Sequence, residues 1–298
     1  MNTAQREEWQ FNAILHILSA LAKSKDIQKS LIFKGALILN QRLPTQRKSL
    51  DIDSNWTADF VKQNPRLEQQ IDFLKKFIEK AIIQYFEKQE PVRFELKYIK
   101  VERNPQNAHP RGWDGILISV SLLDHEKSGI RGLPPLTIDV AAPEEYSEYS
   151  YSEMKLGKST IHAYTLERFA GEKARAFLTS LPTYREKVGK RAKAIRVRDL
   201  YDLAMIIRAN PIKNGRFWRI AGSEFKLCCQ SRFVDCLGTS SFQEKWQLTK
   251  DLYEKSPILP KEIRFKEVES SILSISNYWE KEGIIPFSFP LTTIRTWN

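Results

Sequence analysis

The chain has 298 residues, of which 42% are hydrophobic and 28% are charged, a balance that excludes an intrinsically disordered protein. Its length predicts either one large domain or two smaller domains in close contact. The formal net charge of +11 favours polyanionic partners, although a basic surface kept for solubility would give the same charge. The first residues lack the apolar segment of a secretory signal, and no apolar stretch reaches transmembrane length. We therefore expect a cytoplasmic protein with no membrane partner.

The hydrophobic pattern predicts a mixed first half and a mainly helical second half. In chain order, we expect a helix over 7–23, a short apolar run over 30–33, a helix start over 36–41, a strand over 49–53, a long helix over 64–88, strands over 92–101, 115–122 and 136–141, and helices over 166–181 and 196–208. Residues 144–152, rich in Glu, Ser and Tyr, are predicted to be a linker or mobile loop. The predicted fold class is α+β, with a mixed sheet flanked by helices over 1–150 and a mainly helical part over 151–298.

Three aspartates on predicted strands are the candidate metal ligands. Asp51 and Asp53 alternate with Ile52, so both carboxylates point to one face of their strand. Asp139 has a similar setting, with apolar neighbours on another strand. If these strands pair, the three carboxylates converge, and hard oxygen ligands of this kind suit Mg²⁺. Asp139 would then be both a ligand and a candidate base, whereas the competing interpretation of the Asp51–Asp53 pair is a solvated strand edge.

A possible phosphate cradle lies upstream of these acids. Lys34, Gly35 and Ala36 open a helix directly after the apolar run, and helix N-termini offer free N–H groups to anions. Ser49 lies two residues before Asp51 and is expected to donate its hydroxyl to the same phosphates. A glycine in this position is often only a turn, so the order of the motifs carries more information than each motif alone.

In combination, these segments resemble the nucleotidyltransferase AbiEii toxin family, which belongs to the DNA polymerase β-like nucleotidyltransferase superfamily. The resemblance rests on Phe33–Leu37 followed by the Ser-x-Asp-Ile-Asp block at 49–53, on Glu172-Lys173-Ala174, and on the Arg-Asp-Leu-Tyr-Asp-Leu block at 198–203. The chain departs from the family where Gly35-Ala36 replaces the usual Gly-Gly or Gly-Ser. The region after Ala209 carries no motif of the family.

The resemblance implies a role for each matching residue. Asp51, Asp53 and Asp139 would bind metal, and Lys173 would contact the triphosphate of a nucleoside triphosphate. Asp199 would hold the active-site helices, with Asp202 one turn later on the same face. Without the family, Lys173 would be read as part of a solvated helix face, and the two aspartates as partners of Arg196 and Arg198.

The resemblance further implies transfer of a nucleoside monophosphate by the toxin of a bacterial toxin–antitoxin or phage-defence pair, with an antitoxin as partner. The positive charge favours RNA, such as a tRNA 3′ end, as the acceptor. Two alternatives remain: a non-catalytic binder of nucleic acid or antitoxin on a degenerate fold, and transfer to a protein hydroxyl. The best candidate for a phosphate track is the basic run over 187–198, for which a solvated loop is the alternative, and Trp218 could stack on bases, although core packing explains Trp218 better.

Overall fold

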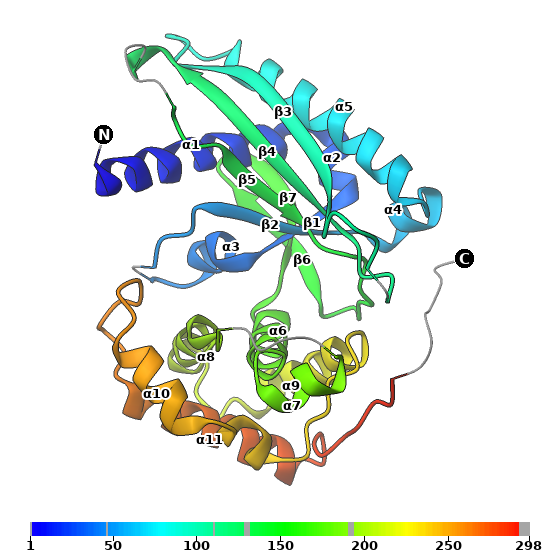
Figure 1. Cartoon of the computed structure of the whole chain (residues 1–298), viewed down its shortest axis with the longest axis vertical. Helices are drawn as coiled ribbons and strands as arrows, with labels where there is room; N and C mark the ends of the chain where they lie inside the picture. The colour runs from blue at the N-terminus through cyan, green and yellow to red at the C-terminus, as the bar shows by residue number, and fades with distance from the viewer. Residues whose placement is uncertain (1, 46, 110, 128–131, 190–193, 292–298) are drawn as a thin grey trace.

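A mixed seven-stranded sheet forms the upper part of the molecule in Figure 1, and a group of helices forms the lower part. The computed structural model describes residues 2–45, 47–109, 111–127, 132–189 and 194–291. The strands are β1 (Leu31–Lys34), β2 (Asp51–Trp56), β3 (Phe94–Asn104), β4 (Gly115–Asp124), β5 (Leu136–Val140), β6 (Tyr151–Leu156) and β7 (Ser159–Tyr164). Their order in the sheet is β3-β4-β5-β2-β1-β7-β6.

The strands that carry the candidate site lie at the centre of the sheet. β2 pairs in parallel with β5 on one side and antiparallel with β1 on the other. Along β2, Ile52, Ser54 and Trp56 are buried, whereas Asp51 is exposed and Asp53 is partly buried. This alternation anchors the strand in the core through one set of side chains and turns the acidic set toward the helical half.

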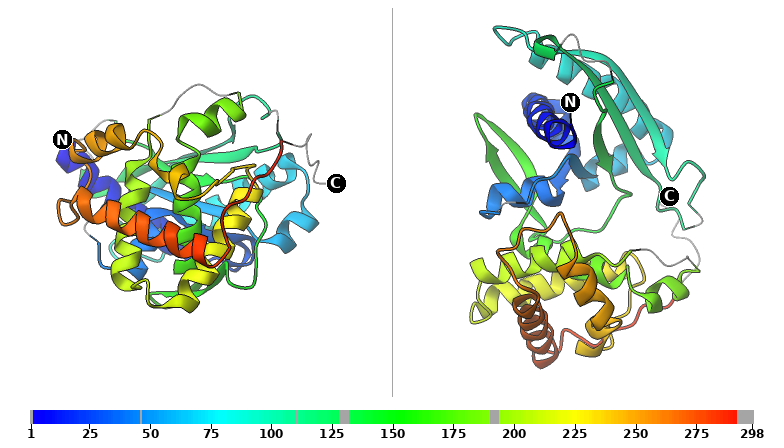
Figure 2. Two further views of the ribbon diagram at one scale, coloured as in Figure 1. Left: turned by 90° about the horizontal axis from the view of Figure 1, so that it is seen from below. Right: turned by 60° about the vertical axis from the view of Figure 1, so that its left-hand side comes forward.

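Helices cover the sheet and then form a separate layer. The α-helices are α1 (Thr3–Lys23), α2 (Lys25–Ser30), α3 (Gly35–Arg42), α4 (Ala58–Gln63), α5 (Leu67–Phe86), α6 (Leu166–Leu178), α7 (Pro182–Lys187), α8 (Val197–Ala209), α9 (Gly215–Gln230), α10 (Trp246–Glu254) and α11 (Phe265–Lys281). α1 and α5 pack against each other and against the sheet, whereas α6 packs against α8 and α9. Figure 1 and the right-hand view of Figure 2 agree that α6 to α11 lie together below the sheet. None of the described helices is long and apolar enough to cross a membrane.

The α+β fold class is confirmed, and most of the expected strands and helices appear near their predicted limits. The sequence pattern did not predict the β6–β7 hairpin, which continues the sheet beyond residue 150 and turns at Gly157 with a positive φ of 61°. The division of the chain into 1–150 and 151–298 stays a prediction. The mainly helical part of the observed fold begins at α6.

The segment predicted as a linker or mobile loop, 144–152, has no helix or strand as far as Ser150 and enters β6 at Tyr151, but part of it is packed into the core. Glu144 and Ser150 are buried, and Ser150 donates a hydrogen bond of 2.7 Å to Glu224 on α9. The polar composition that suggested a linker instead supplies buried hydrogen bonds between the sheet and the helices.

Candidate active site

Three neighbouring strands place Lys34, Asp53 and Asp139 in one row across the sheet. Lys34 on β1 is the register partner of Asp53 on β2, and Asp53 is the register partner of Asp139 on β5. Side chains at paired positions of adjacent strands point to the same face of a sheet. The predicted pairing of the two acidic strands is therefore present, and Lys34 at one end of the row contacts Glu172 on α6 of the helical half.

Asp51 lies two residues before Asp53 on the same face of β2. Ser49 donates its hydroxyl to Asp51 Oδ1 over 2.6 Å. This bond orients one carboxylate of the pair at the point where the chain enters β2. The expected contact between Ser49 and nucleotide phosphates stays a prediction, and it would compete with the bond to Asp51.

Gly35, the first residue of α3, lies directly against the Asp53 carboxylate. Its φ is +77°, and a Cβ added there would be 1.9 Å from Asp53 Oδ2. Two independent reasons therefore require glycine: the left-handed backbone conformation and the space that the carboxylate fills. Ala36, in the same first turn of α3, is buried.

Burial and mutual repulsion raise the pKa of the acids in the row. Burial, followed by the charge of Asp51, raises the pKa of Asp53 to about 6. Burial also raises the pKa of Asp139, partly opposed by Lys34 and assisted by Asp51. The charge of Asp51 thus acts on both other carboxylates, which shows that the three acids share one electrostatic environment.

The donor chemistry of this row fits a divalent cation. The candidates are carboxylate oxygens, which Mg²⁺ prefers, and the raised pKa values of Asp53 and Asp139, caused first by burial and then by the charge of Asp51, show that a nearby cation would be favourable. Among the residues that the structure describes, no group of three or more His, Cys, Asp or Glu side chains is already arranged around a common metal position. Side-chain rotation at Asp51 and Asp139 would therefore accompany metal binding.

A second group of charges lies on the helices that face the sheet. Lys173 on α6 is buried, and its Nζ lies 3.1 Å from Asp199 Oδ1 and 2.8 Å from Asp202 Oδ2, both on α8. Asp199 also pairs with Arg196, and Arg47 Nη1 lies 2.7 and 2.6 Å from the two carboxylate oxygens of Asp202. The result is a chain of alternating charges, Arg47–Asp202–Lys173–Asp199–Arg196, which we call the charge ladder. Lys173 is therefore no part of a solvated helix face.

The charge ladder keeps its buried members ionised. Burial alone would lower the pKa of Lys173, but Asp202 and Asp199 together raise it above its usual value. Burial alone would raise the pKa of Asp199, but Lys173 and Arg196 bring it well below its usual range. Lys173 and Asp199 are thus both charged at neutral pH, because their neighbours offset the cost of burial.

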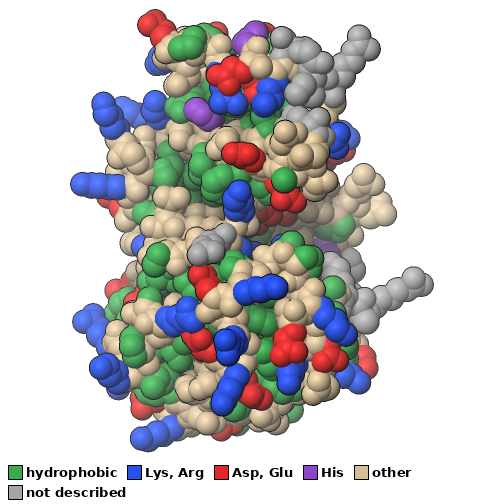
Figure 3. Space-filling view, turned by 90° about the vertical axis from the view of Figure 1, so that its left-hand side faces the viewer, with side chains coloured by type: hydrophobic (Ala, Val, Ile, Leu, Met, Phe, Trp, Pro, Cys, Tyr) green, Lys and Arg blue, Asp and Glu red, His purple; other side chains and the backbone are tan. Residues whose placement is uncertain are grey.

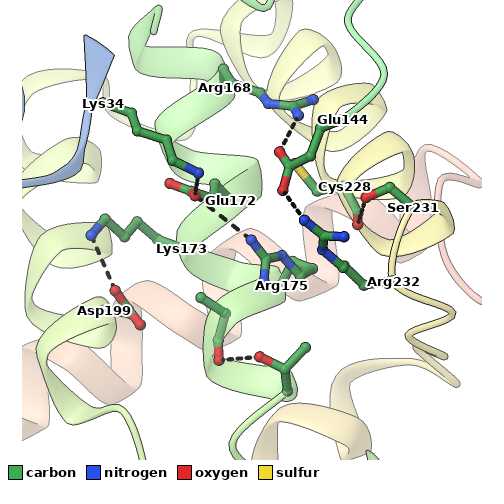
Figure 4. A network of polar contacts seen from close by, with 12 residues as sticks. Lys34, Glu144, Arg168, Glu172, Lys173, Arg175, Asp199, Cys228, Ser231 and Arg232 are labelled. Carbon is green, nitrogen blue, oxygen red and sulfur yellow. Dashed lines mark hydrogen bonds and ion pairs between the residues drawn. The ribbon is translucent and has the colours of Figure 1, made fainter. Parts of the chain in front are cut away.

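A further buried network, drawn in Figure 4, joins the sheet to α6 and α9. Lys34 Nζ lies 3.1 Å from Glu172 Oε1, and Arg175 lies 3.6 Å from the same oxygen. Arg168, which is fully buried, pairs at 3.0 Å with Glu144 Oε2. Figure 4 shows these side chains pointing toward one another from β1, α6 and the segment after β5.

Arg47, Glu144 and Glu172 belong to these networks and were not predicted as site residues. Arg47 lies in the loop before β2, where only its closeness to the Ser-x-Asp-x-Asp block could have drawn attention to it. Its partner Asp202 is 155 residues away along the chain. Glu144 belongs to a segment whose polar composition indicated a linker, so no local pattern identified it.

The basic run over 187–198 is partly engaged in ion pairs, and Trp218 lies in the core. Lys187 pairs with Asp235 at 2.7 Å, and Arg196 belongs to the charge ladder. The central part of the predicted phosphate track, residues 190–193, lies outside the described residues. Trp218 is fully buried and donates to the carbonyl of Asn210 over 2.9 Å, so core packing explains it. The three cysteines, Cys228, Cys229 and Cys236, are free and buried.

Comparisons with known proteins find one matching family and structures of similar fold. The model of a family described as "Nucleotidyl transferase AbiEii toxin, Type IV TA system" matches residues 16–270. No match was found among curated proteins. The crystal structure of JHP933 from Helicobacter pylori is similar in fold, with a TM-score of 0.50, 13% identity, and coverage of 95% of this chain and 96% of that chain. A nucleotidyltransferase candidate from H. pylori gives a TM-score of 0.47 and 12% identity, with coverage of 94% of this chain and 95% of that chain.

Proposed function

This chain belongs to the nucleotidyl transferase AbiEii toxin family of type IV toxin–antitoxin systems, and from that premise we propose that it transfers a nucleoside monophosphate from a nucleoside triphosphate to RNA, with Mg²⁺ as cofactor. The family assigns it to the nucleotidyltransferases and implies an antitoxin partner. The observation that carries the proposal is the register that aligns Asp53 with Asp139 on adjacent strands, opposite the charge ladder.

We propose that Asp51, Asp53 and Asp139 hold Mg²⁺. Their oxygen donors and raised pKa values support this assignment. The bound cation would neutralise triphosphate charge and polarise the α-phosphate. Lys34 is held at the edge of this row by Glu172, so its positive charge stabilises the row without filling the space between the carboxylates.

In the proposed step, an acceptor hydroxyl oxygen attacks the α-phosphorus of the nucleotide. A bond forms between that oxygen and phosphorus, the bond to the bridging oxygen breaks, and pyrophosphate leaves. Asp139 is the candidate base for the hydroxyl proton, because its carboxylate lies in the same row as Asp53, beside the proposed metal position. Nearly all the catalysis in such a step comes from positioning and charge stabilisation.

Lys173, with Arg47 beside it, is the proposed ligand of the triphosphate. Both cations are held by Asp202 at hydrogen-bond distance, and the charge of Asp51 also acts on Arg47. The N-terminus of α3, at Gly35 and Ala36, offers further N–H groups to the phosphates beside Asp53. A triphosphate would thus replace the Asp202 carboxylate, which already lies between Arg47 and Lys173.

RNA is the proposed acceptor because the net charge of +11 favours a polyanion. Lys and Arg side chains gather on the visible face of the helical half, next to an indentation between the two halves (Figure 3). A tRNA 3′ end is the specific acceptor we propose. Transfer to a protein hydroxyl is the alternative outcome that the following experiment distinguishes.

The test is to incubate the purified protein with each α-³²P nucleoside triphosphate, Mg²⁺ and either total RNA or RNase-treated lysate. We expect label in RNA with one preferred nucleotide, and loss of labelling on addition of EDTA. Asp51→Asn and Asp53→Asn should abolish transfer, whereas Asp59→Asn, at an exposed acid of α4, should not. Label that appears only in protein would overturn the RNA acceptor, and full activity of Asp53→Asn would overturn the metal assignment.

A further inference from the structure

The turn between β3 and β4 carries a group of rings and cations that reaches the helical half. In Figures 1 and 2 this end of the hairpin extends down from the sheet toward α7 and the C-terminal end of α9. His109 and Trp113 lie on the turn with ring centroids 5.1 Å apart and planes 28° apart. Trp113 then meets Phe233, in the turn after α9, at 5.9 Å and 31°. We call this run of three rings the aromatic column.

Guanidinium groups from both halves surround the aromatic column. Arg232 lies 5.2 Å from the centroid of the Trp113 ring, and Arg111 lies 6.0 Å from it. Arg111, Arg185 and Arg232 also all act electrostatically on the phenol of Tyr184, whose hydroxyl donates to the carbonyl of Arg232 over 2.9 Å. Three separate segments thus bring positive charge to one place.

Buried polar contacts hold the aromatic column in place. Arg232 donates to Glu144 Oε1 over 3.1 Å, and Glu144 is in turn fixed by the buried Arg168. Phe233 has a φ of +56°, a left-handed conformation that costs a non-glycine residue energy and persists only when its surroundings impose it. The surrounding structure therefore holds the Phe233 ring in place through an unfavourable backbone conformation. The acids near the column are already engaged: Asp114 accepts from the backbone N–H of His109, Glu144 pairs with Arg232, and Asp235 pairs with Lys187.

The aromatic column lies at the same end of the sheet as the row formed by Lys34, Asp53 and Asp139. Ile116 of β4 pairs with Val140 of β5, so the turn before β4 projects just beyond the level of Asp139. Arg232 also lies 3.5 Å from the carbonyl of Ala142, three residues after Asp139, a chain distance of about 10 Å. His109, Arg111, Trp113 and Phe233 are all partly exposed.

We propose that this surface binds the single-stranded segment of the RNA acceptor next to its reacting end, an unpaired base extending the aromatic column and Arg111 binding a phosphate. The proposal rests on the proposed function, whose acceptor it locates. Aromatic rings and cations along a groove are the features that bind single strands with little dependence on sequence. Unpaired bases can stack on such rings, whereas bases within a duplex cannot.

The test measures fluorescence anisotropy of a fluorescein-labelled, unstructured 12-mer RNA with the full chain at several KCl concentrations, without nucleotide. Trp113→Ala and His109→Ala should each weaken binding about five- to a hundredfold while leaving its salt dependence unchanged. Arg111→Ala should instead reduce the slope of log affinity against log salt by about one unit. Trp113→Phe should restore most of the affinity because it keeps a ring.

Matched controls separate this surface from general charge or damage to the fold. Trp246→Ala on α10 and Arg216→Ala in the first turn of α9, about 21 Å along the helix from its last residue, Gln230, should bind as the native chain does. Binding of a duplex of the same length should be unaffected by Trp113→Ala. A change at Trp113 that merely loosened the fold would lower affinity for both RNAs and lower the melting temperature, and that result would overturn the proposal.

The outcome is independent of whether transfer occurs. If the native chain labels RNA but Trp113→Ala binds and labels it equally well, the aromatic column is not the acceptor surface and the proposed function stands. If Trp113→Ala selectively loses single-strand binding while no variant transfers label, the surface is established and the transfer reaction fails. Absence of single-strand binding by the native chain overturns the inference.

Discussion

Asp53 combines a role in the proposed chemistry with a cost to stability. Its side chain fills the space above Gly35 and shares its surroundings with Asp51, and together burial and this neighbour raise its pKa to about 6. A group whose folded pKa is raised favours folding when protonated, and this contribution is lost as the pH rises through the folded pKa. At neutral pH the ionised Asp53 therefore opposes folding.

Asp53→Asn should consequently stabilise the protein above pH 6, by up to about 3 kcal/mol if the whole shift is recovered. We expect its melting temperature at pH 7.5 to exceed that of the native chain by several degrees. The difference should shrink toward pH 4, where the carboxyl group of Asp53 is neutral in the folded chain. Added Mg²⁺ should stabilise the native chain and leave the variant unchanged. A lower melting temperature of the variant at pH 7.5 would contradict this account.

Lys173, unlike Asp53, is expected to stabilise the fold, because its positive charge compensates the buried carboxylates of Asp199 and Asp202. Lys173→Met removes the cation between Asp199 and Asp202 and should cost about 3 kcal/mol of stability. The double variant with Asp199→Asn should recover much of that stability but no transfer activity. Urea unfolding with a parallel labelling assay measures both. Recovery of activity along with stability would mean that Lys173 only holds the fold.

Among the elements, α3 begins at a glycine that lies against the Asp53 carboxylate. Gly35 has a φ of +77°, and so has Gly132, but a Cβ at Gly132 would meet nothing within 4 Å. The two glycines share the backbone cost of substitution, so a comparison of them isolates the contact with Asp53. Comparing substitutions at Gly35 and Gly132 therefore separates the effect of backbone strain from the effect of displacing the Asp53 carboxylate.

Gly35→Ala should lose nearly all transfer activity and its stabilisation by Mg²⁺ with nucleotide, because the methyl group displaces the Asp53 carboxylate. Gly132→Ala should cost about 1 kcal/mol of stability and keep full activity. Thermal unfolding with and without Mg²⁺ and nucleotide, together with the labelling assay, measures these effects. Equal activity of the two variants would show that Asp53 moves aside without consequence.

The elements that the sequence predicted are those with a local signal. Alternation of polar and apolar residues placed Asp51, Asp53 and Asp139 on strands, and the order of the motifs suggested that these strands meet. The β6–β7 hairpin escaped prediction because its first strand, Tyr151–Leu156, is largely exposed and polar. The partners in the charge ladder escaped because Arg47 and Asp202 become neighbours only when the helical half folds against the sheet.

At the scale of the whole molecule, buried ion pairs join the sheet half to the helical half. Glu144 follows β5, Arg168 lies on α6, and Arg232 follows α9. Burial alone would raise the pKa of Glu144, but Lys34, Arg232 and Arg168 bring it well below its usual range. This stabilising contribution is present above the usual pKa of a glutamate and is lost as the pH falls through the folded pKa.

Glu144→Gln should therefore destabilise the chain by about 3 kcal/mol at pH 7, since it leaves Arg168 and Arg232 with less compensation. Glu148→Gln, at an exposed acid of the same segment, should be neutral. Urea unfolding at pH 7 and pH 4 measures both variants, and the difference between Glu144→Gln and the native chain should narrow at the lower pH. A neutral Glu144→Gln would mean that the two halves are held together without this network.

The charge ladder has a consequence for how the two substrates would arrive. Because Asp202 already neutralises Arg47 and Lys173, an incoming triphosphate exchanges one anion for another, and few counterions are released. Nucleotide affinity should change little between 50 and 300 mM KCl, whereas RNA affinity should fall steeply over the same range. At high ionic strength the protein would keep its bound nucleotide but release the RNA acceptor. Raising the salt concentration should therefore separate nucleotide binding from nucleotide transfer.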